Sequence, residues 1–287
     1  MYESILQMNN ISKVSIHGGH SGEFCHHAKD RLEDLIKAYI KMGFHWVGIT
    51  EHIPPPNNTL RYQDEIEAGL DDHFLRQQFT RYFHKARSLQ KKYQDDIQLF
   101  IGFESESYSG YISHVNSLIQ AYQPDYVVGS VHHVDDINFD YSPEFYEKAV
   151  KQAGGIIPLY VRYFDIQFEM IQQLSPKVIG HFDVIRIFDP LYRKHLEIPE
   201  ISKRIHRNLS LICSKQMILD YNLRSLLKGA DEPYISNCIL KVAQSMGISI
   251  VPGDDSHSLD TVGLNIETGI RLLQNVGVSV QWQKPVL

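Results

Sequence analysis

Histidine and acidic residues are placed along this chain in a pattern that could bind metal ions. The stretch "SIHGGHSGEFCHHAKD", residues 15–30, holds four of the fifteen histidines and one of the three cysteines. Farther along, single His, Glu or Asp residues lie at the ends of short apolar runs such as "WVGITEH", "LFIGFE" and "KVIGHFD". The residues of this set are His17, His20, His27, His52, Glu104, His132, His181, Asp255 and His257.

These residue types are ligands of transition-metal ions. Buried imidazoles and carboxylates are costly unless they are paired or coordinate a metal, and their combination suits zinc, iron or manganese alike. One histidine after a strand is more often an ordinary core or surface residue, so the signal lies in the number. Nine candidates exceed the about four to six ligands that one ion uses, which indicates two or three divalent ions.

Short runs rich in β-branched residues predict the strands that carry these side chains. They span 13–17, 46–52, 99–104, 126–133, 177–183, 217–222 and 249–257. Segments with helical periodicity lie between most of them, clearest at 30–43, 71–93, 143–153, 201–214 and 234–247. Such alternation implies a parallel sheet, either open or closed. Ligand-type residues end nearly every strand, which favours a closed barrel over an open sheet with its site at one switch point.

Length, charge and cysteine content narrow the class further. The 287 residues suffice for a large core, and no linker or repeat divides them, so we expect one domain over 1–287. The net charge of −6 without a basic run argues against nucleic acid or an acidic membrane as the main partner. Separated cysteines, an N-terminus unlike a signal peptide and the lack of an apolar run near ~20 residues predict a cytoplasmic protein.

The motifs "H…H…C-x-H", "TEH", "GxE", "GSVH", "GHFD" and "DxH" together resemble the polymerase-and-histidinol-phosphatase (PHP) family, in particular its histidinol-phosphate phosphatase branch. The phrases "GFHWVGITEH", "DYVVGSVHHVD" and "VIGHFDVIRIFD" extend the resemblance over roughly residues 13–270. It implies a distorted (β/α)7 barrel of the TIM type with a trinuclear metal site at the C-terminal ends of the strands. The nine residues above would then be the metal ligands, with Glu104 as the bridging carboxylate.

Three details depart from the family pattern. The family begins His-x-His, whereas this chain has "HGGH", and we expect its two glycines to form a bulge or turn that restores the convergence of both rings. In "GDDSH" the two-residue spacing to His257 favours Asp255 over Asp254 as the ligand. Glu51 stands where many relatives have Asp, and it is interpreted as a helper that hydrogen-bonds a ligand histidine. Cys25 fits the family pattern and is interpreted as a packing residue, with a ligand role as its alternative.

The resemblance also implies how a phosphate ester would be bound and cleaved. A hydroxide bridging the metal ions is the expected nucleophile, because coordination lowers the pKa of water toward ~7. Arginines at positions like Arg186 and Arg224 grip the phosphate in the family, and Arg162 is a third candidate for substrate binding. The acid that protonates the leaving group stays open among Asp183, His133, Asp135 and Glu106.

The expected activity is hydrolysis of L-histidinol phosphate, a small phosphorylated metabolite, in histidine biosynthesis. One alternative is a PHP phosphoesterase acting on another small phosphomonoester, a phosphodiester or a nucleotide, since one scaffold serves all of these. Another is a non-catalytic metal-binding domain, although all nine ligand positions can be filled. A related amidohydrolase barrel carries a lysine ligand, and none of the strand ends quoted is lysine. Oligomeric state is left open.

Overall fold

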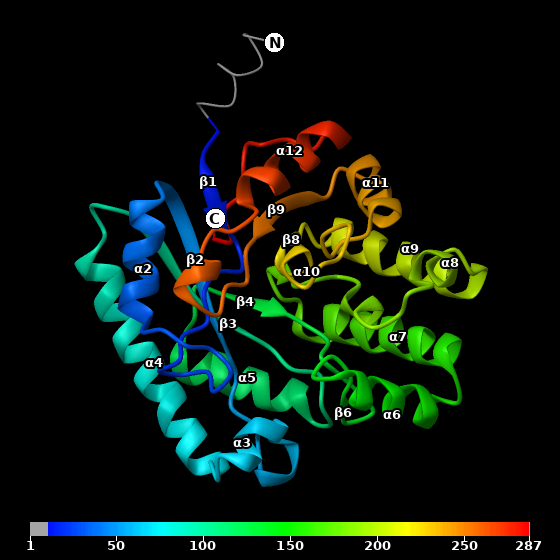
Figure 1. The fold of residues 1–287 in the computed structure, drawn as a ribbon, viewed down its shortest axis with the longest axis horizontal. Helices are drawn as coiled ribbons and strands as arrows, with labels where there is room; N and C mark the ends of the chain where they lie inside the picture. The colour runs from blue at the N-terminus through cyan, green and yellow to red at the C-terminus, as the bar shows by residue number, and fades with distance from the viewer. Residues whose placement is uncertain (1–10, 287) are drawn as a thin grey trace.

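A nearly closed barrel of parallel strands forms the centre of the computed structural model, which describes residues 11–286 (Figure 1). Beyond β1, the amide of Ile16 donates to the carbonyl of Pro252 at 2.9 Å, and Asp255 donates to the carbonyl of His17 at 2.9 Å, so the first and last strands meet. In order around the sheet the strands are β1 (Lys13–Ser15), β2 (Phe44–His52), β3 (Gln98–Glu104), β4 (Tyr126–Gly129), β7 (Val178–Ile179), β8 (Ile218–Asn222) and β9 (Ser249–Gly253).

Helices surround this barrel and join its strands (Figure 1). The longer ones are α2 (Leu32–Lys41), α4 (Asp72–Lys92), α5 (Tyr111–Tyr122), α6 (Pro143–Ala153), α7 (Ile156–Leu174), α9 (Pro199–Ser214), α11 (Asn237–Ser245) and α12 (Ile266–Val276). The short elements are η1 (Asn58–Leu60), α3 (Gln63–Glu67), η2 (Val184–Arg186), α8 (Tyr192–Leu196), α10 (Arg224–Leu227), η3 (Leu259–Thr261) and an antiparallel hairpin of β5 (His133–Val134) and β6 (Ile137–Asn138).

The two faces of the strands build two separate apolar clusters. Successive side chains of a strand point to opposite faces, and on β3 Leu99, Ile101 and Phe103 belong to the large cluster that packs against the helices. Phe100 points the other way and joins a second cluster with residues of other strands, including Trp46. The barrel interior is therefore filled with side chains, as in TIM barrels, and leaves only the ends of the strands free to form a site.

The predicted barrel and its seven strands are confirmed. The five predicted helices are present, α6 with the predicted bounds and the others with ends shifted by up to three residues, whereas α5, α7 and α12 were not predicted. The predicted strand 126–133 ends at Gly129, because its continuation "HHVDDIN" folds back as the β5–β6 hairpin, with Asp135 and Asp136 at positive φ in the turn. Residues 1–10 of the segment compared with signal peptides lie outside the described residues.

Within residues 11–286, no helix is both long enough and apolar enough to cross a membrane.

Candidate metal centre

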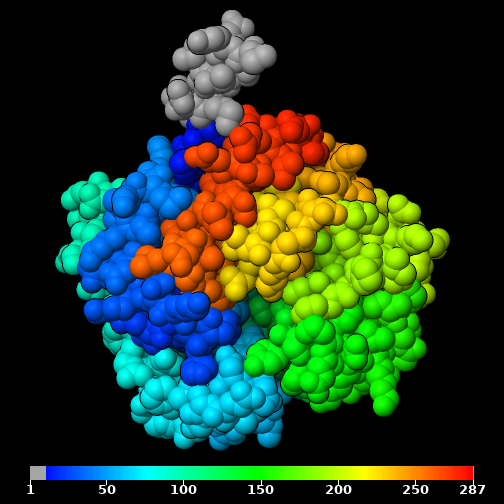
Figure 2. Space-filling view, in the orientation of Figure 1, coloured from blue at the N-terminus to red at the C-terminus, as the bar shows by residue number. Residues whose placement is uncertain are grey.

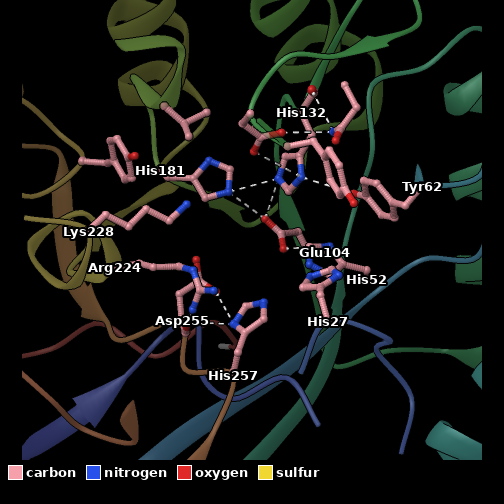
Figure 3. Close-up of a pocket in the computed structure, with 15 residues that line it drawn as sticks. His27, His52, Tyr62, Glu104, His132, His181, Arg224, Lys228, Asp255 and His257 are labelled. Atoms are coloured by element: carbon pink, nitrogen blue, oxygen red, sulfur yellow. Dashed lines mark hydrogen bonds and ion pairs between the residues drawn. The ribbon is translucent and has the colours of Figure 1, made fainter. Parts of the chain in front are cut away.

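Side chains at the carboxyl ends of the strands converge on one end of the barrel (Figure 3). His52 and Glu104 are the last residues of β2 and β3, which pair with each other in register. His132 and His181 follow β4 and β7 in the next two positions around the sheet. Parallel strands bring all their carboxyl ends to one rim, so residues 129 positions apart in the chain become neighbours.

Glu104 lies at the centre of this group, and its two carboxylate oxygens face different imidazoles. Oε1 is 2.8 Å from Nε2 of His181 and 3.0 Å from Nε2 of His132. Oε2 is 3.2 Å from Nδ1 of His52 and 3.3 Å from Nε2 of His17. A carboxylate with each oxygen serving its own pair of nitrogens is arranged to bridge two metal ions.

The remaining predicted ligands lie on the other side of the cluster, around His20. Its Nε2 is 3.3 Å from Oδ1 of Asp255, and its ring is 4.4 Å from that of His257 and 4.5 Å from that of His52. The ring of His27 stacks on that of His257 at 5.1 Å. The structure therefore brings all nine predicted residues together in one cluster.

The glycines of "HGGH" let the chain pass unusually close to β2. The amide of Gly18 donates to the carbonyl of Gly48 at 2.9 Å, and a Cβ at Gly18 would lie only 2.2 Å from that same oxygen. The amide of His20 donates to the carbonyl of Ser256 at 2.7 Å. This tight turn uses the extra residue while both His17 and His20 stay fully buried in the cluster.

Several ring nitrogens of the cluster are buried without a hydrogen-bond partner. Within residues 11–286 they include Nε2 of His17, both nitrogens of His20, Nδ1 of His52 and Nδ1 of His181. Unpaired buried polar atoms are costly, so this donor set fits metal ions. Ligand atoms within 4.8 Å of one another form four groups of three or four, drawn from His17, His20, Cys25, His52, Glu104, Glu106, His132, His181 and His257.

Two members of these groups were not predicted as ligands. Cys25 is buried, with its Sγ 3.2 Å from Nε2 of His27. Glu106 lies two residues after Glu104, and its Oε2 is 3.1 Å from Nδ1 of His133. Both are close enough to the predicted ligands to influence the same ions.

Opposite charges crowd the cluster and shift its pKa values. Burial alone would lower the pKa of His17, but the carboxylates of Glu104 and Asp255 raise it well above its usual range. Burial would raise the pKa of Glu104, but the imidazoles around it hold that pKa well below its usual range. Burial and the charge of His52 lower the pKa of His20 to about 3. The lowered pKa values keep His20 neutral and Glu104 ionised, which are the forms that bind metal ions, whereas His17 must release a proton when an ion binds.

Two buried carboxylates outside the cluster lie next to the Nδ1 atoms of His17 and His20. Oδ2 of Asp220 on β8 lies 2.9 Å from Nδ1 of His17. Glu51 accepts hydrogen bonds from the amide and hydroxyl of Ser21, both at 2.8 Å, and its other oxygen is 3.8 Å from Nδ1 of His20. Such partners orient metal-binding imidazoles. Sequence reasoning anticipated Glu51 but missed Asp220, although its place near the end of "MILDYN" was the available signal.

The two aspartates of "GDDSH" point in different directions. Asp255 faces the cluster, whereas Asp254 accepts hydrogen bonds from Ser15, Tyr39 and the amide of Gly263 behind it. The structure thus turns Asp255, and not Asp254, toward the predicted ligand His20.

A cavity of about 230 Å³ opens above the cluster, and Figure 2 shows the hollow in the middle of this face. His27, Tyr62, Asp140, Arg224 and Lys228 are among its lining residues. In Figure 3, Arg224 and Lys228 lie on one side of the cluster and Tyr62 on the other. Burial lowers the pKa of Lys228, and the nearby Arg224 lowers it further. Lys228, Tyr62 and Asp140 were not singled out from the sequence, because none belongs to a recognisable motif.

The three candidate arginines occupy different environments. Arg224 lines the cavity and donates to the carbonyl of Asp255 at 2.7 Å. Arg186 is buried outside the cavity lining, where its guanidinium lies 4.7 Å from the ring centres of both Tyr192 and Tyr234. Arg162 lies in α7, 45% exposed, and pairs with Asp135 at 2.9 Å. Only Arg224 is in place to contact a ligand in the cavity.

A barrel with a carboxylate-centred histidine cluster at the carboxyl ends of its strands defines the class of (β/α) barrels that bind metal ions at this end. Residues 18–224 match the PHP domain. This chain belongs to the PHP domain family.

Named relatives and a solved structure show which members of the family this chain is similar to. A protein of Schizosaccharomyces pombe named "Probable histidinol-phosphatase" is 35% identical over 93% of this chain and 87% of its own length. The histidinol-phosphatase of Saccharomyces cerevisiae is 28% identical over 86% and 84%. The fold is similar, with a TM-score of 0.72, to that of histidinol phosphate phosphatase from Lactococcus lactis in complex with zinc, L-histidinol and phosphate. That chain is 20% identical, and the match covers 93% of this chain and 95% of that one.

Proposed function

We propose that this protein is a metal-dependent phosphomonoesterase that hydrolyses L-histidinol phosphate to L-histidinol and phosphate. Relatives that match most of the chain carry the name histidinol-phosphatase. The observation that carries the proposal is the geometry of Glu104, whose two oxygens each lie within 3.3 Å of two imidazoles. The seven strands of the one large sheet extend from residue 13 to residue 253 of the chain. This supports a single PHP-type domain over 1–287.

The metal ions of this proposal are two or three divalent transition-metal ions, with zinc favoured because the Lactococcus lactis protein was crystallised with it. Bound there, they would supply Lewis-acid activation of water and neutralise charge on the phosphoryl group. The residues that would hold them are His17, His20, His27, His52, Glu104, His132, His181, Asp255 and His257. Iron and manganese accept the same ligands.

The cationic side chains of the cavity would bind the phosphoryl group. Arg224 and Lys228 line the same cavity as the cluster, and charged hydrogen bonds to phosphate are strong. The carbonyl of Asp255 holds one end of the Arg224 guanidinium, which fixes its direction. We assign phosphate binding to Arg224 and Lys228, and to Arg186 the positioning of the wall that contains Tyr234, because Arg186 does not line the cavity.

Buried carboxylates outside the cluster would keep the imidazoles in their productive orientation. Asp220 would hold the proton on Nδ1 of His17 and leave Nε2 free to act as a ligand. Glu51 would do the same for His20 from a position fixed by Ser21. The small cavity favours a metabolite over a nucleic-acid strand, which requires a long cationic groove.

A phosphate-release screen with metal-reconstituted protein tests the proposal. The substrates are L-histidinol phosphate, a panel of other small phosphomonoesters and a phosphodiester. We expect the highest kcat/KM for L-histidinol phosphate. A higher value for another monoester would replace the substrate but keep the enzyme class. Preference for the diester, or no hydrolysis at full metal loading, would overturn the proposal.

A further inference from the structure

Asp140 is an acidic residue of the cavity that the cluster itself does not use. It lines the cavity together with Arg224 and Lys228, and its side chain is 19% exposed. It belongs to none of the groups of ligand atoms found in residues 11–286. A carboxylate that faces a cavity from outside the metal cluster is available to a ligand.

The β5–β6 hairpin holds Asp140 in a defined orientation. The Asn138 side-chain amide donates to Oδ1 of Asp140 at 3.0 Å and to the carbonyl of His132 at 3.2 Å. The other oxygen, Oδ2, accepts no hydrogen bond from the described residues and lies 4.0 Å from Nδ1 of His132. One oxygen is therefore fixed by the protein while the second is free for a cation next to the cluster.

Opposite charges therefore line the same cavity. Asp140 forms no ion pair with Arg224 or Lys228 within residues 11–286, although all three line the space. A ligand that carries a phosphate and a cationic group could satisfy both sides at once. In L-histidinol phosphate the ammonium is on the carbon next to the phosphate-bearing methylene, so it is the cation nearest the phosphate.

We propose that Asp140 binds the ammonium group of the substrate through Oδ2 and thereby selects aminoalkyl phosphates over phosphate esters that lack an amine. This inference rests on the proposed phosphomonoesterase function and names the group that gives it specificity. Asp140 lies within 4.0 Å of His132, so an ammonium bound there would be near a phosphate held at the cluster. The imidazole of the substrate would extend beyond it toward the cavity mouth.

Two substrate pairs that differ only in the amine test this subsite. The first is L-histidinol phosphate with imidazolylpropyl phosphate, and the second is aminoethyl phosphate with ethyl phosphate. For the wild type we expect a higher kcat/KM for the amine-bearing member of each pair. Asp140→Asn should reduce this preference by about ten- to a hundredfold, because it removes a charged hydrogen bond. If no compound turns over, the ratio of calorimetric dissociation constants within each pair tests the same preference at the level of binding.

Asp136→Asn is the matched control, because it removes one negative charge from the same hairpin outside the cavity lining. Asparagine tolerates its positive φ of 64°, and an amide oxygen can still accept from the amide of Ser109. This variant should keep the wild-type preference.

Three results would overturn the subsite: a wild type without preference for the amine, an unchanged preference in Asp140→Asn, or loss of metal from Asp140→Asn. The last would show that Asp140 supports His132. Failure of the proposed function is distinguishable. In that case L-histidinol phosphate would be a poor substrate, while aminoethyl phosphate would still be preferred over ethyl phosphate in a way that depends on Asp140.

Discussion

Glu104 shares its two carboxylate oxygens among imidazoles that come from β1, β2, β4 and β7. Replacing it with Gln keeps the shape but removes the charge and turns one acceptor into a donor. We expect Glu104→Gln to lose metal and to abolish phosphate release, with a far-ultraviolet circular dichroism spectrum like that of the wild type. Metal stoichiometry by mass spectrometry and a phosphate assay measure both effects, with the exposed Glu67→Gln as control. Near wild-type turnover in Glu104→Gln would contradict the bridging role.

Glu51 makes a pH-dependent contribution to stability in the metal-free protein. Burial raises the pKa of Glu51 to about 7 from its ordinary value of 4.5. Between these pH values the unfolded chain releases the proton while the folded protein keeps it, so stability relative to Glu51→Gln falls as the pH rises. The change should total about 3 kcal/mol, at ~1.4 kcal/mol for each pH unit.

Urea unfolding of both proteins in the presence of a chelator, from pH about 4 to 8, measures this difference. Glu51→Gln serves as the control for the wild type, because it keeps an acceptor for Ser21 but has no titrating group at this position. A stability difference that stays constant across this range would show that Glu51 has an ordinary pKa.

At the scale of single elements, α10 and its C-cap residue carry both cations of the cavity, Arg224 and Lys228. We expect Arg224→Ala and Lys228→Ala each to lower kcat/KM by about ten- to a hundredfold, since a charged hydrogen bond contributes about 1.5–3 kcal/mol. Metal content and Tm should change little. Steady-state kinetics and calorimetry measure these quantities.

Arg186→Ala is the informative comparison for these variants. Arg186 is buried and pairs with Asp183 at 3.2 Å, so its loss leaves a buried carboxylate without its cation and should destabilise the fold by about 3–5 kcal/mol. A stable Arg186→Ala enzyme with a strongly raised KM would instead place Arg186 on the phosphate.

The turn after β1 is the other element that decides the geometry of the site. A methyl group at Gly18 would lie 2.2 Å from the carbonyl oxygen of Gly48 and 2.6 Å from a methyl of Val47. Neither the β2 backbone nor the packed valine can move without shifting the turn. We expect Gly18→Ala to cost about 1–3 kcal/mol and to weaken metal binding through His17 and His20.

Thermal unfolding and metal titration measure these two effects of Gly18→Ala. Gly69→Ala is the control for metal affinity: its methyl group meets nothing within 4 Å, but its φ of 71° strains an alanine outside the cluster, so Tm should fall while metal affinity stays unchanged. Unchanged metal affinity in Gly18→Ala would show that the close approach to β2 does not position the two histidines.

At the scale of the whole molecule, the metal centre joins strand ends from around the entire barrel. Ions that bind only the folded protein stabilise it by mass action, about 2.7 kcal/mol for one site at a hundredfold excess over Kd. For a domain of this size we expect metal loading to raise Tm by about 5 °C for each ion. Imidazoles must release protons to bind metal, and carboxylates raise the pKa of His17 well above its usual range, so the gain should shrink progressively on acidification.

Scanning calorimetry of chelated and zinc-reconstituted protein at two pH values measures this gain. Elemental analysis of the reconstituted sample should find two to three ions per chain. Equal Tm values with and without metal would contradict the convergence of these ligands on bound ions.

The local pattern of the sequence determined much of the fold and of the candidate site of this protein. The alternation of apolar runs with amphipathic segments predicted the parallel barrel, because strand and helix periodicities are written in neighbouring residues. The rule that parallel strands expose their carboxyl ends on one rim then indicated that residues as distant as His17 and His257 meet. Two-residue spacing predicted that Asp255 rather than Asp254 faces the cluster, but the tertiary structure turns Asp255 there through a positive φ of 46°, not through an extended segment.

Tertiary structure alone decided which charges reach the cavity. Arg186 and Arg224 both follow strand ends, yet one is enclosed by two tyrosine rings and the other lines the cavity. Lys228 and Asp140 come from a short helix cap and a hairpin that no motif marks. The direction of a loop side chain depends on packing against segments far away in the chain, which a pattern of adjacent residues does not encode.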